Sequence, residues 1–144
     1  MKTVAHLLKM KGNDIFSISP NATVRQALEK LVEKNIAGLV AMEEGKLVGI
    51  FTERDYARKV VLKGKSSKDT LVREIMTEHV ISVGPETSID TCMELMTHRQ
   101  IRHLPVLQNG AVVGVISIGD LVKFIIEDQK HTIKNLESYI ATGG

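Results

Sequence analysis

The chain has 144 residues, of which 43% are hydrophobic, 25% charged and 3% aromatic, and its net charge at neutral pH is +2. This composition is ordinary for a globular domain, and the small charge and scarce aromatics argue against nucleic-acid binding. No apolar run is long enough to span a membrane, no secretory leader is recognisable, and the single cysteine excludes an intrachain disulfide framework. We therefore expect a cytoplasmic protein with no nucleic-acid or membrane partner.

The first half of the chain predicts a strand, a helix, a hairpin and a second helix in that order. Segment 15–18 alternates apolar and polar residues before Pro20, which suits a short strand. Thr23 precedes an apolar stripe with helical spacing and is placed as its N-cap. Two apolar runs around a turn predict a hairpin over 38–51, and a helix is expected over 52–61.

The second half repeats this plan 65 residues later without a gap. The elements expected there are a strand at 80–83, a helix at 88–97, a hairpin at 103–116 and a helix from Gly119 onward. The expected fold class is α/β (α+β), with two β-α-β-β-α units packed with pseudo-twofold symmetry. The predicted organisation has four parts: a first unit with its N-terminal lead-in (1–62), a linker (63–71), a second unit (72–128), and a C-terminal helical extension and tail (129–144). The second unit is expected to open with a short helix.

The motif glycine-x-x-hydroxyl-x-x-aspartate occurs in both units, where the last strand meets its helix. The hydroxyl, Thr52 or Ser117, opens the helix, and the aspartate, Asp55 or Asp120, lies in its first turn. Free N–H groups at a helix start attract phosphate, and a carboxylate suits the vicinal hydroxyls of ribose. The same spacing is also a plain capping arrangement. Two copies in register favour a nucleotide site in each unit.

At these residues the chain resembles a known family. GLVAMEEGKLVGIFTERD (38–55), VREIMT (72–77) and RHLPVLQNGAVVGVISIGD (102–120) resemble a tandem pair of CBS domains, or Bateman module. The resemblance covers almost the whole chain, as in stand-alone prokaryotic CBS-domain proteins. It implies binding of adenosine-containing ligands in two clefts: AMP, ADP, ATP or NAD(H), with S-adenosylmethionine less favoured. It also implies a disc-like dimer of two pairs.

The resemblance also implies roles for particular residues. Asp55 and Asp120 are expected to hold ribose hydroxyls, with Thr52 and Ser117 near the ribose-phosphate portion. The residues before two of the prolines are expected on the adenine side, and the starts of the middle strands at the cleft borders. The implied nucleotide-binding set is Ser19, Ala37, Gly38, Thr52, Arg54, Asp55, Gly84, Arg102, His103, Ser117 and Asp120.

The two copies differ in charge beside the motif. Arg102 and His103 stand where the first unit has two small residues, and Arg54 stands where the second unit has a glycine. We interpret all three as phosphate contacts, which predicts two clefts of unequal affinity or preference. The alternatives are an ion pair of Arg54 with Glu53 or Asp55, and packing of Arg102 and His103 across a dimer face.

Other reactive side chains are interpreted as structural. Cys92, Met93 and Met96 lie on a predicted helix stripe, the histidines lack metal-ligand spacing, and no catalytic triad, carboxylate pair or Walker loop is evident. The leading hypothesis is a non-catalytic regulatory module that signals energy or redox state to an unidentified protein by altered packing of its units. The alternatives are an interaction module with vestigial clefts, which the two intact aspartates weigh against, and a nucleotide hydrolase, which lacks an evident base.

The C-terminal segment predicts one long amphipathic helix. Apolar residues recur at three- and four-residue steps, with Gln129 filling one gap. From His131 onward this stripe has no counterpart in the first unit, and we expect it to help hold a homodimer, or a higher oligomer. The alternative is that it folds back on its own subunit. The stripe residues are Val122, Ile126, Ile133, Leu136 and Ile140.

Overall fold

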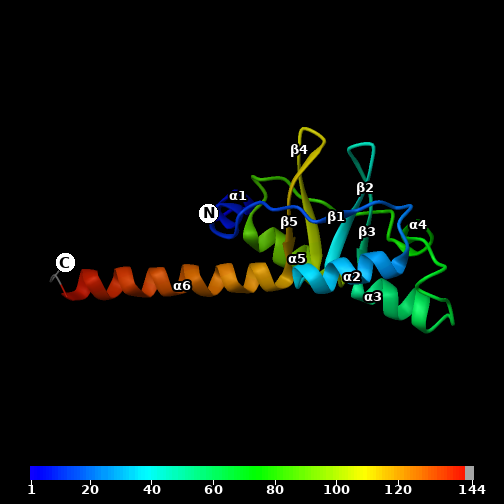
Figure 1. Cartoon of the computed structure of the whole chain (residues 1–144). Coiled ribbons are helices and arrows are strands. Elements are labelled where there is room, and N and C mark those ends of the chain that lie inside the picture. Colours follow the sequence, from blue (N-terminus) through cyan, green and yellow to red (C-terminus); the bar gives the residue numbers. More distant parts are fainter. Residues whose placement is uncertain (142–144) are drawn as a thin grey trace.

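The computed structural model describes residues 1–141. It has two small sheets with flanking helices and a long C-terminal helix that projects beyond the rest of the molecule (Figure 1). The mixed α/β fold with two repeated units and an extended last helix is therefore confirmed. None of the helices within 1–141 combines the length and the apolar character needed to cross a bilayer.

The first unit contains a three-stranded sheet in which β1 is parallel to β2 and β2 is antiparallel to β3. Helix α2 starts at the expected place because Thr23 and Gln26 form a reciprocal capping box, with N–H to oxygen distances of 2.9 and 3.1 Å. The last helix of this unit, α3, continues as a π-helical turn, η1. The elements are β1 (Ser17–Ile18), α2 (Val24–Lys34), β2 (Gly38–Glu43), β3 (Lys46–Thr52), α3 (Glu53–Tyr56) and η1 (Ala57–Val61).

The second unit repeats the hairpin but loses most of its first strand. In the first unit, the N–H of Val40 donates to the carbonyl of Phe16 at 3.4 Å. Its counterpart 65 residues later is Pro105, which has no N–H to donate. Of the expected strand at 80–83, only a bridge between Val83 and Val106 forms. The other elements are α5 (Ile89–Arg99), β4 (His103–Gln108), β5 (Ala111–Ser117) and α6 (Ile118–Ala141).

Each unit has its own hydrophobic core, and the short lead-in helix that precedes each unit in sequence packs into the core of the other unit. Helix α1 (Val4–Lys11) buries Val4 and Leu7 in the core of the second unit. Helix α4 (Val72–Ile75) buries Val72 and Ile75 in the core of the first. The N-terminal lead-in therefore precedes the first unit in sequence but packs on the second.

Cys92 and Met96 lie in the second core, and Met93 packs against it, as expected. Burial raises the pKa of the Cys92 thiol to about 11, so the reactive thiolate is scarce at neutral pH. Within residues 1–141, no three His, Cys, Asp or Glu side chains form a group that could hold a metal ion.

Candidate functional site

Two clefts of about 360 Å³ each lie where one unit meets the other. Each combines the glycine-hydroxyl-aspartate motif of one unit with the strand start of the other unit. The first cleft is lined by Ala37, Ile50, Thr52, Glu53, Arg54, Asp55, Arg58, Lys59, Thr77, Gln100, Ile101, Arg102 and His103. The second is lined by Lys11, Gly12, Asp14, Phe16, Asn35, Ile36, Ala37, Gly38, His103, Val115, Ser117 and Asp120.

The walls opposite the two aspartates are related by the internal repeat. Residues 100–103 face Asp55, and residues 35–38 face Asp120. Each wall begins at a helix cap in the left-handed conformation, Asn35 (φ 53°) or Gln100 (φ 54°), which turns the chain from the helix into the strand. This crossed pairing makes both clefts sensitive to how the two units are packed.

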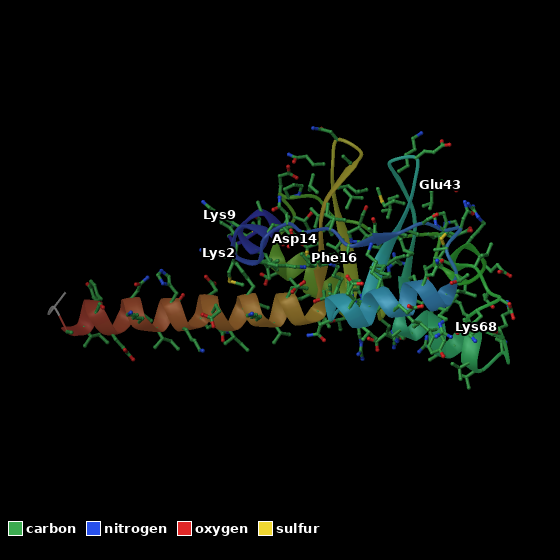
Figure 2. The ribbon with its side chains drawn as sticks, in the orientation of Figure 1. Lys2, Lys9, Asp14, Phe16, Glu43 and Lys68 are labelled. Atoms are coloured by element: carbon green, nitrogen blue, oxygen red, sulfur yellow. The ribbon has the colours of Figure 1, made fainter. Side chains whose placement is uncertain are left out.

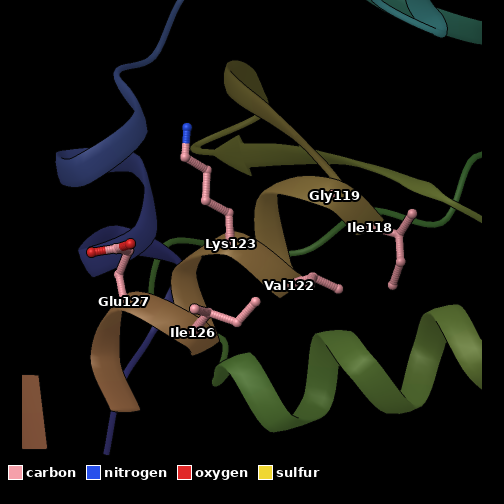
Figure 3. A pocket seen from close by; sticks show the side chains of 6 residues that line it. All are labelled: Ile118, Gly119, Val122, Lys123, Ile126 and Glu127. Atoms are coloured by element: carbon pink, nitrogen blue, oxygen red, sulfur yellow. The ribbon is translucent and has the colours of Figure 1, made fainter. Parts of the chain in front are cut away.

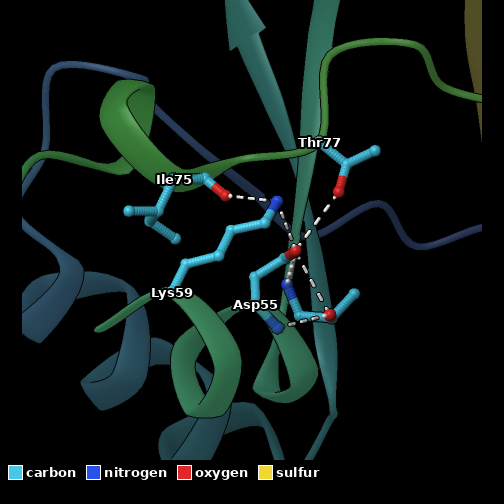
Figure 4. A network of polar contacts seen from close by, with 5 residues as sticks. Asp55, Lys59, Ile75 and Thr77 are labelled. Atoms are coloured by element: carbon cyan, nitrogen blue, oxygen red, sulfur yellow. Dashed lines mark hydrogen bonds and ion pairs between the residues drawn. The ribbon is translucent and has the colours of Figure 1, made fainter. Parts of the chain in front are cut away.

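In the first cleft, hydrogen bonds and an ion pair surround Asp55 (Figure 4). Its Oδ2 accepts from the N–H of Thr52 at 3.0 Å and from the Thr52 hydroxyl at 3.2 Å. Its Oδ1 accepts from the Thr77 hydroxyl at 3.2 Å and lies 3.0 Å from Nζ of Lys59. A carboxylate has about four acceptor positions, so those of Asp55 are filled by the protein itself.

In the second cleft, Asp120 is held differently. Its Oδ2 accepts from the N–H of Ser117 at 2.8 Å and lies 2.6 Å from Nζ of Lys11, which also donates to the Val115 carbonyl. No hydrogen bond among the described residues reaches Oδ1. Burial opposes ionisation of this carboxyl, but the hydrogen bonds from Lys11 and Ser117 outweigh it and hold the pKa of Asp120 below its usual value.

His103 lies on the wall between the clefts and lines both of them. A Cβ at Gly38 would lie 3.0 Å from its ring, which is tighter than ordinary van der Waals contact, so a side chain at residue 38 would press on the imidazole. Burial lowers the pKa of His103, the carboxylate of Asp120 raises it, and Lys11 and Arg102 lower it further. The net shift is downward, so the neutral ring predominates at pH 7.

This shift predicts a pH-dependent loss of stability. Because the folded pKa of His103 lies below its ordinary value of 6.5, the unfolded chain binds its proton first as the pH falls. The contribution of His103 is therefore complete above pH 6.5 and declines between 6.5 and the folded pKa. In urea unfolding at pH 7.5 and 5.5, the wild type should lose more stability than His103→Gln. Equal losses would show that His103 is not the titrating group.

The two arginines identified from sequence converge on the first cleft. The guanidinium of Arg54 donates to the carbonyl of Gln100 at 2.6 Å and so joins the two units. The expected alternative, pairing with Glu53 or Asp55, does not occur among the described residues. Arg102, from the second unit, also lines the first cleft, where it faces the motif of the first unit. Arg54 belongs to the first unit and Arg102 to the second, but the crossed packing of the units places both in the same cleft.

Ser19 and Gly84 do not line either cleft. Strand β1 runs parallel to β2, and its Ile18 pairs with Ala41, whereas the cleft borders the start of β2 near Gly38. The chain therefore leaves the cleft as it moves from β1 to Ser19. Gly84 lies at the matching position, where its N–H donates to the Thr87 hydroxyl at 3.0 Å. The other end of this segment reaches the cleft instead, through Phe16.

Several cleft residues were missed by the sequence analysis. Lys59 could have been found, because it lies four residues after Asp55 on the same helical face. Lys11, Asp14 and Phe16 carry no comparable local signal, since they reach the second cleft from the end of α1 and from the segment that leads from α1 into β1. Figure 2 shows Asp14 and Phe16 on this segment.

Two repeated units that enclose a pair of clefts, each with a motif aspartate, define a tandem ligand-binding class of protein. The CBS domain model matches residues 6–62 and 72–127, so the chain belongs to the CBS-domain family. It is 37% identical to "CBS domain-containing protein CBSX3, mitochondrial" of Arabidopsis thaliana, over 98% of this chain and 73% of that protein. The name of this relative places it in mitochondria, so a cytoplasmic location for the present chain stays a prediction.

The fold is shared by solved structures of CBS-domain proteins. A putative signal-transduction protein with CBS domains from Burkholderia ambifaria MC40-6 is 50% identical, with a TM-score of 0.85 over 89% of this chain and 96% of that chain. The CBS domain pair of the protein MJ0100, in complex with 5′-methylthioadenosine and S-adenosyl-L-methionine, is 27% identical. Its TM-score is 0.79 over 89% of this chain and 98% of that chain.

Proposed function

We propose that this chain is a non-catalytic regulatory module that binds adenosine-containing ligands in its two clefts and signals their level to a partner protein. AMP, ADP, ATP and NAD(H) are the leading ligands, so the signal is energy or redox state. The observation that carries this proposal is the presence of two clefts of about 360 Å³, each with a partly or wholly buried motif aspartate. This volume lies in the range of small-molecule sites. The ligands bound to MJ0100 support the adenosine class.

The motif aspartates suit ribose because a carboxylate can accept from both vicinal hydroxyls. Asp120 has an oxygen, Oδ1, that no described residue engages. Asp55 must exchange an existing contact, and on its Oδ1 the Thr77 hydroxyl is the neutral donor beside the charged Lys59. Ribose binding at Asp55 should therefore loosen the link between α3 and the segment after α4.

Signalling follows from the separation of the two cores. The units bury separate hydrophobic clusters, and the clefts take walls from both units. A ligand held between them stabilises the arrangement in which both walls reach it, and so shifts the population of packings. A partner that contacts both units would detect this shift.

The alternative, an interaction module with vestigial clefts, has one observation in its favour. The acceptor positions of Asp55 are filled without a ligand. Binding measurements separate the two functions, since a vestigial cleft would leave nucleotide affinity independent of both aspartates.

The test is isothermal titration of AMP, ATP, NADH and S-adenosylmethionine into the wild type, Asp55→Asn, Asp120→Asn and the double variant. Asparagine keeps the shape of the side chain but removes the charge that strengthens hydrogen bonds from ribose. Each substitution should weaken binding at its own cleft by about 1.5–3 kcal/mol, or tenfold and more. Asp69→Asn in the exposed linker is the matched control and should bind as the wild type does. Unchanged affinity in the folded double variant would contradict the proposal.

We further propose that the module works as a homodimer joined through α6. Positions 122, 126, 129, 133, 136 and 140 recur at alternating steps of four and three, which is the heptad seam of a coiled coil. Ile133, Leu136 and Ile140 are 56%, 57% and 75% exposed. The seam continues to the base of α6, where Val122 and Ile126 line an open hollow (Figure 3). A second copy of α6 matches this seam in length and periodicity.

A further inference from the structure

Charged side chains are distributed unequally between the two clefts. In the first cleft four cations face two carboxylates, and in the second one cation faces two carboxylates. His103 lines both clefts and does not distinguish them. The first set is Arg54, Arg58, Lys59 and Arg102 with Glu53 and Asp55, and the second set is Lys11 with Asp14 and Asp120.

Most of the positive charge in the first cleft is not compensated locally. Lys59 pairs with Asp55, but Arg54 donates only to a neutral carbonyl. Arg58 and Arg102 form no hydrogen bond or ion pair with any residue in 1–141. Both are exposed, so they keep their hydration until a ligand arrives. Guanidinium groups match the oxygens of phosphate in a bidentate geometry, which makes this cleft suited to a phosphorylated ligand.

The second cleft has no comparable set of uncompensated cations to bind a phosphate among the residues that line it. Its cation, Lys11, lies 2.6 Å from the Asp120 carboxylate and is therefore compensated. Asp14 adds a further negative charge, while Phe16 and Val115 contribute apolar surface. A phosphate placed here would lose its hydration and meet carboxylates, which is unfavourable. An adenosine ligand whose 5′ group is neutral or positive would avoid this repulsion from the carboxylates.

We propose that the clefts take different classes of adenosine ligand. The first takes a phosphorylated adenosine nucleotide, and the second takes an adenosine derivative without a negative charge at its 5′ position. This inference rests on the proposed function and names the ligand class of each cleft. The ribose contact through the motif aspartate is common to both, and the substituent at the 5′ position decides the cleft. The module then responds to two kinds of metabolite at once.

The experiment titrates AMP and 5′-methylthioadenosine, separately and together, into the full-length chain. Each should bind one site per chain, without displacing the other. The double variant Arg58→Gln/Arg102→Gln should weaken AMP by about tenfold or more, equal to about 1.4 kcal/mol, and leave 5′-methylthioadenosine unchanged. The control is Arg99→Gln, which removes an exposed cation near the end of α5 that does not line the first cleft. It should change neither affinity.

Two further readouts assign each ligand to its cleft. Asp55→Asn should weaken AMP, and Asp120→Asn should weaken 5′-methylthioadenosine. Added salt should weaken AMP and spare the uncharged ligand, because it screens the arginines.

The outcomes distinguish this inference from the function on which it rests. If both ligands bind but compete, or if one aspartate variant weakens both, the clefts do not sort ligands by charge, and the proposed function stands. Unchanged AMP affinity in the arginine double variant also overturns the sorting alone. If neither ligand nor any other adenosine compound binds, both proposals fail.

Discussion

A chain that ends at Gln129 is expected to be monomeric at concentrations where the full-length chain is a dimer. The truncation removes Ile133, Leu136 and Ile140 from the proposed seam, three exposed side chains that gain about 1.5–3 kcal/mol each when buried. The dissociation constant should therefore rise on the order of a thousandfold or more. Light scattering and sedimentation over a range of concentrations measure this change.

The physical reason to expect a partner is the length of the unsupported helix. Helix α6 has 24 residues, and its residues from Gln129 onward lie outside both hydrophobic cores. Isolated helices of about 12–15 residues are marginal in water, so packing against another helix would stabilise this half.

A matched pair of point variants tests the seam without shortening the chain. Leu136→Glu puts a charge into the seam, and Asn135→Glu puts the same charge beside it. The first should dissociate the dimer and the second should not. If the wild type is monomeric at high concentration, or if the truncated chain dimerises equally well, the assembly proposal is wrong.

The sequence was sufficient for the features that depend on local pattern. Repeated motifs, apolar periodicity and caps such as Thr23 are set by neighbours within a few residues, and they located the helices and hairpins closely. The motif positions of Asp55 and Asp120 could also be found this way, because the internal repeat aligns them without a gap.

What the sequence could not show depends on contacts between distant segments. Lys11 reaches Asp120 across 109 residues, because α1 crosses to the second unit. Arg102 faces Asp55 only because the first cleft takes one wall from each unit. No residue pattern encodes these contacts locally, and the direction of β1, which removes Ser19 from the cleft, appears only once its pairing with β2 is known.

The crossed packing of the lead-in helices predicts that Leu7→Ala destabilises the second unit, although Leu7 precedes the first. Leu7 is fully buried and belongs to the same core as Leu104 and Ile116. Truncating a buried leucine to alanine costs about 2–5 kcal/mol, a large fraction of the 5–15 kcal/mol that holds a typical domain folded. Urea unfolding measures the loss, and hydrogen exchange shows where protection falls first.

The matched variant is Ile75→Ala in α4, whose side chain lies in the core of the first unit. Leu7→Ala should expose amides of the β4–β5 hairpin before those of β2–β3, and Ile75→Ala should do the reverse. Met10→Ala, at a half-exposed position of α1, should change stability by no more than about 0.5 kcal/mol. If both core variants released the same hairpin first, the two lead-in helices would not be stabilising opposite units. Because Lys11 lies one turn after Leu7, losing this anchor should also release Asp120, which links the stability of α1 directly to ligand binding in the second cleft.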